Sequence, residues 1–397
     1  MEPGTPDKAP ETAAVRSSCP LALARPAIDR QRRRVGGWKT IPLTSFGPIG
    51  HALLALTTPE INDDIRHRAC QVASQLQTET VMKPYYWESQ HGNFGDDLNL
   101  WLWDFLLPGF REVYPETLLV GVGTVLNRAL LPKATHKLVI GSGFGYGTLP
   151  DMSDPKEWDI RSVRGPLTAA KVGVAPELGI IDPAVMVADL PEFQGLRKIY
   201  KRSFVPHWES AIAGLWPAIC DAVGLNYIDP RGEAKDVIRK IGQSELIVAE
   251  SMHGAILADA FRVPWTAVST SHSINSFKWN DWAQTLGVTY RPRRVPVSTR
   301  AEAMIKGARF WGMDFQAKEP QPEDPNRRQI DGDLAVAERE PRQTSLRAAA
   351  KRALAAPATL ALWQASRAAP QLSKDSALAE RKERFRTVLD GIRRDYF

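Results

Sequence analysis

The sequence contains few cysteines and no long apolar run, and both absences restrict what the protein can be. Its three cysteines, Cys19, Cys70 and Cys220, share no metal-ligand spacing and form no even disulfide framework. No apolar run is long enough to span a bilayer, and the N-terminus lacks the charged and apolar regions of a secretory signal. We therefore expect a cytoplasmic protein that is soluble or peripheral at the inner face of a membrane.

Strong charge bias is also missing. The chain has 51 Lys and Arg against 45 Asp and Glu, a formal net charge of +6 over 397 residues. The basic residues form no stripe interleaved with aromatic side chains, so the sequence does not predict a nucleic-acid partner. It also shows no cluster of His, Cys and carboxylate ligands, so we expect neither a metal ion nor another cofactor.

From Met82 onward, apolar runs alternate with helical patterns at the spacing of βαβ units. The predicted strands form two series, over residues 83–87, 117–122, 137–142 and 160–164, and over residues 198–206, 224–228, 245–249 and 265–269. This pattern predicts an α/β fold of two Rossmann-like domains, over residues 81–195 and 196–313. Ligands of such sheets bind beyond the carboxyl ends of the strands, so we expect the site in the cleft between the halves.

The flanking segments have a different composition. Residues 1–80 show no sustained periodicity and are predicted to be a disordered extension, and residues 314–345 have the polar composition of a linker. Residues 346–397 are predicted to be a basic helical tail, in which 346–367 carry four basic residues, no acidic ones, and an interruption at Pro357. Its basic, partly apolar part either lies on an anionic membrane surface or packs on the second domain.

The first motif with chemical potential is the segment 88–98, which follows a strand and opens a segment of helical pattern that ends at Leu107. Glycines on both sides of Asn93 allow a tight turn, and Asp96 is placed to cap the helix. A capped strand-to-helix turn explains the pattern by itself. Because Asn93, Gly95, Asp96 and Asp97 lie at the carboxyl end of a strand, a carboxylate there can also orient or deprotonate a sugar hydroxyl.

Two further motifs are suited to binding an anion. Residues 141–147 contain four alternating glycines after a strand, which lets backbone N–H groups approach an anion, or lets the loop pack on a neighbouring strand. Arg164 ends another strand just before Pro166, which suits the first turn of a helix. An arginine beside a helix N-terminus is typical of a phosphate or carboxylate site.

The most specific motif is Glu250-Ser251-Met252-His253-Gly254, at the start of an apolar helix after the strand 245–249. A single histidine is often a structural residue. Its position at the mouth of the sheet, after a glutamate and before a glycine, favours a role as general acid or base near neutral pH.

Four motifs in order, at residues 92–96, 163–166, 182–184 and 250–254, make the chain resemble the polysaccharide pyruvyl transferases, especially the succinoglycan-type ketal transferases. The resemblance runs from about Met82 to Gly312. It implies a fold like that of the GT-B glycosyltransferases, phosphoenolpyruvate as the donor, and a lipid-linked oligosaccharide of exopolysaccharide biosynthesis as the acceptor.

The resemblance also implies roles for single residues. His253 is the proton donor, Asp96 or Asp97 accepts the hydroxyl proton, and Arg164 holds the donor's phosphate or carboxylate. Many members have an arginine where this chain has Ser251, so either Lys278 or Arg161 replaces it or the donor pocket differs. His207 is either a further polar contact or a histidine of a surface loop. A GT-B glycosyltransferase that uses a nucleotide sugar is the alternative function, and a sugar-binding module without catalysis is another.

Overall fold

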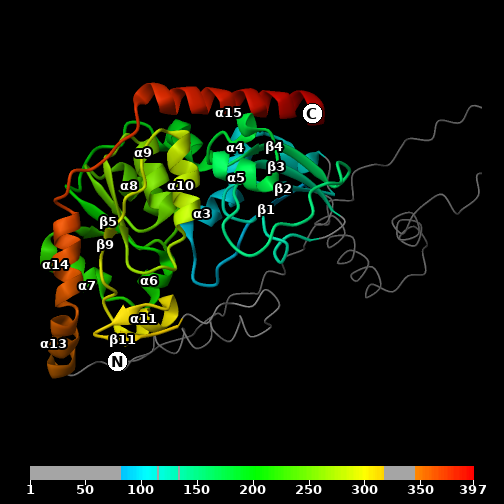
Figure 1. Cartoon of the computed structure of the whole chain (residues 1–397). Coiled ribbons are helices and arrows are strands. Elements are labelled where there is room, and N and C mark those ends of the chain that lie inside the picture. Colours follow the sequence, from blue (N-terminus) through cyan, green and yellow to red (C-terminus); the bar gives the residue numbers. More distant parts are fainter. Residues whose placement is uncertain (1–81, 114–115, 133–134, 317–344) are drawn as a thin grey trace, which may run out of the picture. The chain divides into compact units, whose positions relative to one another are not determined.

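A computed structural model describes residues 82–113, 116–132, 135–316 and 345–397 (Figure 1). The predicted extension over residues 1–80 and most of the predicted linker over residues 314–345 lie outside these residues.

The first sheet is parallel and has four strands in the order β1-β2-β3-β4. Its strands are β1 Lys83–Tyr85, β2 Thr117–Val120, β3 His136–Ser142 and β4 Trp158–Val163. Strand β3 is buried from Lys137 to Ser142, which explains its continuous apolar run from Leu138 to Ile140. The four strands therefore end at the same edge, where loops from different parts of the sequence gather.

The second sheet is also parallel and has the order β6-β5-β7-β8-β9. Its strands are β5 Ser203–Val205, β6 Asn226–Tyr227, β7 Ile247–Ala249, β8 Trp265–Ser269 and β9 Arg293–Arg294. A separate antiparallel hairpin is formed by β10 Arg309–Phe310 and β11 Met313–Asp314.

All eight predicted strands are present, and the mixed α/β class with parallel sheets is confirmed. Five of the predicted strands are longer than the observed ones, and the segment 198–206 differs most. Only Ser203–Val205 of the segment 198–206 is a strand, because Tyr200 makes an isolated bridge to Ser244 instead of continuing the ladder. Strands β9, β10 and β11 were not predicted, since two residues are too few to show a periodic pattern.

Helices follow β1, β4 and each strand of the second sheet, whereas the described residues between β2 and β3 and between β3 and β4 form loops, contrary to the predicted alternation of strands and helices. The α-helices before the C-terminal segment are α3 Phe94–Asp97, α4 Leu102–Leu106, α5 Pro166–Val172, α6 Trp208–Ala213, α7 Trp216–Val223, α8 Ala234–Gly242, α9 Met252–Ala260, α10 Ser276–Thr285 and α11 Arg300–Lys306. The 3-10 helices are η3 Leu98–Leu100, η4 Phe110–Glu112, η5 Pro176–Leu178, η6 Pro183–Asp189 and η7 Pro191–Phe193. The segment from Phe94 to Leu106 is thus three short helices, where the sequence predicted one segment of helical pattern.

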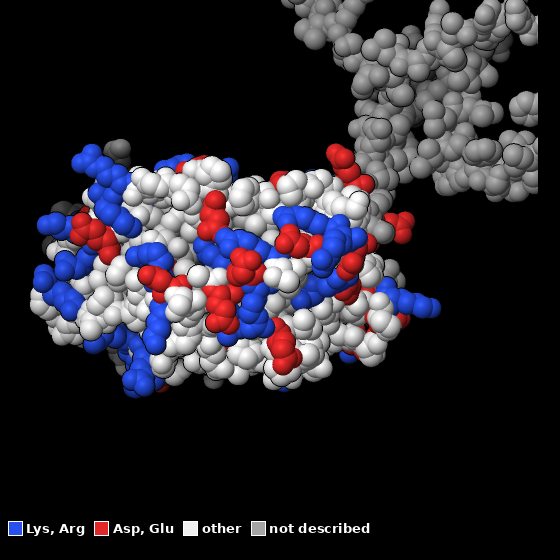
Figure 2. Space-filling model, turned by 90° about the horizontal axis from the view of Figure 1, so that it is seen from above, with Lys and Arg blue, Asp and Glu red and all other residues white. Residues whose placement is uncertain are grey.

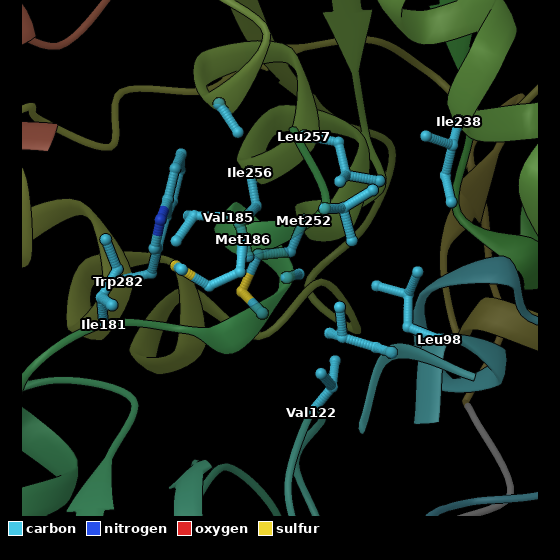
Figure 3. Packing of buried hydrophobic residues seen from close by; sticks show 14 of the residues in the cluster. Leu98, Val122, Ile181, Val185, Met186, Ile238, Met252, Ile256, Leu257 and Trp282 are labelled. Carbon is cyan, nitrogen blue, oxygen red and sulfur yellow. The ribbon is translucent and has the colours of Figure 1, made fainter. Parts of the chain in front are cut away.

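One hydrophobic cluster joins elements of both sheets. Leu98 and Val122 come from the first half, Met252 comes from helix α9, and Val185 and Met186 from η6 lie beside α9 (Figure 3). Helix α9 is buried along its whole length, which accounts for its apolar sequence. The elements that carry the candidate site are therefore fixed by a shared core.

The C-terminal segment forms three helices, α13 Ser345–Leu354, α14 Ala356–Ala365 and α15 Asp375–Tyr396. Pro357 lies in the first turn of α14, where it breaks no helix hydrogen bond. Residues Ala358, Leu362 and Ala365 of α14 are buried in a cluster with Phe204 and Trp216, so α14 packs on the second half, one of the two predicted alternatives.

Helix α15 contacts both halves. Its buried positions Leu378, Phe385, Leu389 and Ile392 recur at helical spacing and join the shared core. At its ends, Arg381 donates to the Thr285 carbonyl and Tyr396 donates to Asp159. Its outer face, seen in Figure 2, mixes acidic and basic side chains, so the predicted basic character is confined to residues before it. Within the described residues, no helix is long and apolar enough to cross a membrane.

Candidate active site

Loops from the carboxyl ends of the strands meet around His253. The imidazole packs on the backbone of Gly95, which follows β1, so closely that a Cβ at Gly95 would overlap the ring. Gly123, which follows β2, contacts the carboxylate of Asp96. Gly145, which follows β3, packs on the stem of Lys278. The structure therefore brings together Gly95, Asp96, His253 and Lys278, four of the residues that the sequence predicted.

His253 is 8% exposed and lies in the first turn of α9, just after the N-cap residue Ser251. The Ser251 hydroxyl accepts a hydrogen bond from the Gly254 N–H at 3.3 Å, so it caps the helix. The Nε2 of His253 is 3.8 Å from Oδ2 of Asp182. Both of these buried atoms lack a hydrogen-bond partner among the described residues, which leaves them available to each other or to a ligand.

Asp182 is the functional residue that sequence reasoning missed. It is fully buried and caps η6, and its Oδ1 accepts from the Ala184 N–H at 3.0 Å while Oδ2 is directed at His253. The signal was an Asp-Pro pair directly after the apolar residues Ile180 and Ile181. The buried Asp182 carboxylate thus lies beside the His253 imidazole, where it can orient the ring.

Asp96 does not cap the helix, contrary to the prediction. Helix α3 already begins at Phe94, with Asn93 as its N-cap residue, so Asp96 lies inside the first turn. Its Oδ2 accepts from Asn93 Nδ2 at 2.6 Å. The buried side chain of Asn99 bonds the Asp96 carbonyl and both backbone groups of Val122, which ties this turn to the end of β2. Asn93 thus orients Asp96, and Asn99 fixes the turn that carries it.

The two neighbouring aspartates have different surroundings. Burial raises the pKa of Asp96 to about 6, and the neighbouring Asp97 also raises it. His253 and Lys278 lower the pKa of Asp96 but do not cancel the effect of burial. Burial also raises the pKa of Asp97, whose other neighbours include Glu88. Only Asp96 has His253 and Lys278 beside it, so Asp96 is the better placed to exchange a proton near neutral pH.

Lys278 supplies a cation on the same side. It lies in the first turn of α10, whose N-cap residue Asn275 also donates to the Gly145 carbonyl, and its Nζ is 4.7 Å from the centroid of the Tyr146 ring. The alternative cation, Arg161, lies elsewhere and pairs with Asp159 and Asp395 at 2.6 and 2.5 Å. Of the two predicted replacements for the missing arginine, Lys278 is the one at the site.

Arg164 is placed differently from the solvent-facing position that its sequence context indicated. Its side chain is fully buried, with Nε 3.0 Å from Asp281 Oδ2, and its other nitrogens donate to Thr124 Oγ1 and the Phe144 carbonyl. The guanidinium packs on Gly143, where a Cβ would overlap it. Arg164 thus anchors the glycine-rich loop to α10 and to the loop after β2.

The glycine-rich loop itself packs on protein groups over its first half. The Gly143 N–H donates to the Gly123 carbonyl at 3.0 Å, and the Phe144 N–H donates to Thr168 Oγ1 at 3.2 Å. These two N–H groups are therefore occupied, which favours the packing interpretation of the loop over anion binding by its backbone.

Glu250 and His207 belong to a buried network beneath the site. Glu250 pairs with Lys306 at 2.7 Å, accepts from the His207 N–H at 2.9 Å, and bonds Thr270, so it joins the ends of three strands. Burial alone raises its pKa, but Lys306, His207 and Thr270 together lower the pKa to about 2. The His207 ring lies within 3.4 Å of Glu209, on the edge of this network.

A comparison with protein-family models matches residues 84–272 to the family described as polysaccharide pyruvyl transferase. The matched segment holds Asp96, Asp182 and His253, and Lys278 follows it. No solved structure matches this chain.

Proposed function

We propose that this chain catalyses pyruvyl transfer. Its residues 84–272 match the polysaccharide pyruvyl transferase family, so the protein is a transferase. The donor is phosphoenolpyruvate, and the acceptor is a sugar diol on a lipid-linked oligosaccharide of exopolysaccharide biosynthesis. One observation carries the proposal. His253, Asp182 and Asp96 are buried close together at the carboxyl ends of parallel strands, where they can act as acid and base.

The reaction needs an acid, a base and a contact for anions. Addition of a proton to the terminal carbon of phosphoenolpyruvate makes its central carbon electrophilic, and one sugar hydroxyl then attacks that carbon. A second hydroxyl attacks the same carbon, the bond to the phosphate oxygen breaks, and a cyclic ketal and phosphate result. Of the two hydroxyl protons, one balances the proton taken up by the terminal carbon and the other leaves with phosphate.

His253 is the proton donor. Its Nε2 lies 3.8 Å from Asp182 Oδ2, its Nδ1 edge faces Gly95, and Asp96 lies close enough to the ring to interact with it. Asp96 accepts the hydroxyl proton. Because its pKa is about 6, Asp96 is ionised at neutral pH and still basic enough to take up that proton. Asp97 has no such neighbours and takes a supporting role.

Lys278 binds the donor's phosphate or carboxylate. Arg164 was the predicted contact, but its guanidinium donates to Asp281, Thr124 and Phe144, so we assign it to positioning the loop around the donor. The N-terminus of α10, ten residues long, adds N–H groups beside Lys278.

We further propose that the two parallel sheets are two Rossmann-like halves in a GT-B-like arrangement. Two observations support this. Both sheets are parallel, with helices between all strands of the second sheet and between β1 and β2 of the first, and the groups of the site come from loops at the carboxyl ends of both sheets.

The test is an assay of phosphate release with phosphoenolpyruvate and lipid-linked oligosaccharides extracted from the host, with mass spectrometry of the acceptor. Wild-type protein should release phosphate and add one pyruvate ketal to the glycan. His253→Gln and Lys278→Met should each lose most turnover, whereas His272→Gln, at an exposed histidine, should keep it. Transfer from a nucleotide sugar with no use of phosphoenolpyruvate would instead assign the glycosyltransferase function.

A further inference from the structure

A surface on the C-terminal helices combines exposed aromatic and aliphatic side chains with basic ones. Its apolar members are Trp311 and Met313 of the β10–β11 hairpin and Leu354, Leu360 and Trp363 of α13 and α14, with exposed fractions between 40% and 60%. We call these five residues the α14 face. Exposed apolar side chains that gather in one region mark an interaction site, whereas scattered ones need no explanation.

The hairpin and the helices are in direct contact. The Trp311 indole N–H donates to the Leu354 carbonyl at 3.0 Å, where α13 ends and α14 is about to begin. Trp311 has a positive φ of 47°, which a bulky residue rarely adopts, so the turn presents its indole at a strained position. In Figure 1, α13 and α14 lie end to end on the side of the second sheet away from β1 to β4.

Helix α14 uses its two faces differently. Ala358, Leu362 and Ala365 are buried against the second half. Leu360, Trp363 and Arg367 recur at intervals of three and four residues, so they share the outer face. This helix therefore has an apolar face in the core and a second apolar stripe exposed.

The charge of α13 and α14 is of one sign. Residues 345–368 contain no acidic residue, and the exposed Arg352 and Arg367 flank the apolar stripe. The Arg367 guanidinium lies 4.6 Å from the centroid of the Trp363 ring, which places a cation beside an exposed indole. The only acidic side chain of the hairpin, Asp314, lies 3.6 Å from Arg309. By contrast, the α15 face in Figure 2 carries acidic and basic groups side by side.

We propose that the α14 face docks on an anionic phospholipid membrane. Indole and leucine side chains insert at the boundary between headgroups and acyl chains, and arginines beside them pair with lipid phosphates. The occupant is argued from charge, because exposed arginines flank the apolar stripe and residues 345–368 contain no acidic residue, which complements an anionic lipid surface. The membrane proposal rests on the geometry of this surface. Its link to activity rests on the proposed function, because a lipid-linked acceptor is found at a membrane.

The test is co-sedimentation of the full chain with vesicles of phosphatidylcholine alone or mixed with phosphatidylglycerol, at low and high sodium chloride. Binding is expected to the anionic vesicles and to weaken with salt. Because each basic residue near such a surface changes affinity by about fivefold, Arg352→Gln with Arg367→Gln should lower partitioning roughly 25-fold. The matched control, Arg384→Gln with Arg394→Gln on α15, should leave partitioning unchanged.

The apolar contribution needs its own pair of variants. Trp311→Ser with Trp363→Ser should abolish partitioning and keep phosphate release with a water-soluble acceptor, because both indoles are exposed away from the site. Leu100→Ser with Phe105→Ser, at 51% and 42% exposure elsewhere, is the control and should bind like wild type. Equal binding to both lipids, binding by the tryptophan variant, or a dimer in sedimentation velocity that this variant disrupts would each overturn the proposal.

Discussion

The contact between Gly95 and His253 allows a precise perturbation of the site. Gly95→Ala adds one methyl group in a short helix, at a position where the new Cβ would overlap the imidazole and approach His253 Cβ to 2.8 Å. Since the neighbour is the His253 ring at the start of a buried helix, it cannot swing away freely. The ring must rotate or move along with the first turn of α9.

The expected cost in folding is small and the expected cost in activity is large. Overpacking by one methyl group costs about 1–3 kcal/mol, and replacing glycine by alanine in a helix returns about 0.5–1 kcal/mol. The net loss of stability should therefore be about 0–2.5 kcal/mol. Displacement of a reacting group by about 1 Å costs on the order of 100-fold in turnover.

Urea unfolding and steady-state phosphate release separate the two effects. Gly95→Ala should lose about 100-fold in turnover while remaining folded in the assay buffer. Gly232→Ala is the matched control, because its Cβ would meet neighbours only at 3.4 Å, an ordinary contact distance. If Gly95→Ala keeps more than about a third of wild-type turnover, the imidazole position is not what the reaction depends on.

Three other variants test separate parts of the structure. Asp96→Asn should lower turnover at least 100-fold, yet at about pH 8 the variant should be more stable than wild type. The pKa of this carboxyl rises from 3.8 to about 6 on folding, so the wild-type protein loses stability as pH rises through that range. Chemical denaturation across pH checks the sign. Arg164→Ala should cost about 3–5 kcal/mol by leaving a buried carboxylate unpaired, whereas Arg161→Ala, at a partly exposed arginine, should cost less than about 1 kcal/mol; a small cost for Arg164→Ala with lost donor affinity would restore it as a donor contact. Lys306→Met should also cost about 3–5 kcal/mol in urea at neutral pH, and the deficit should shrink as pH falls and Glu250 takes up a proton; a deficit that does not change with pH would contradict the ion pair.

The positions of the strands were predictable because burial leaves a local record in the sequence. The buried strands of a parallel sheet need apolar residues on both faces, and runs such as Leu138 to Ile140 and Ile247 to Ala249 are visible without knowledge of the fold. The same logic located His253, since the carboxyl end of a buried strand is a position in the sequence. The two-residue strands β9 to β11 carry no such record.

Pairings across the chain were not predictable. Nothing near Arg164 in the sequence shows that its charge is met by Asp281, 117 residues later, so a strand-end arginine looked available to a ligand. Asp96 and Asp97 are equivalent in sequence, and only the position of α3 sets one beside His253. The sequence around Asp182 indicated a turn, but it did not indicate that the carboxylate lies beside His253.

The sequence by itself determined the α/β class, the positions of the main strands and the match of residues 84–272 to the polysaccharide pyruvyl transferase family. The tertiary structure decided which charged groups pair with each other and which remain available for catalysis. The physical reason is that hydrophobic periodicity acts over a few neighbouring residues, whereas burial of a charge depends on partners that folding brings from distant segments. Arg164 and His253 follow similar strand-to-helix patterns, and only their partners, Asp281 at 3.0 Å and Asp182 at 3.8 Å, distinguish a structural anchor from a candidate acid.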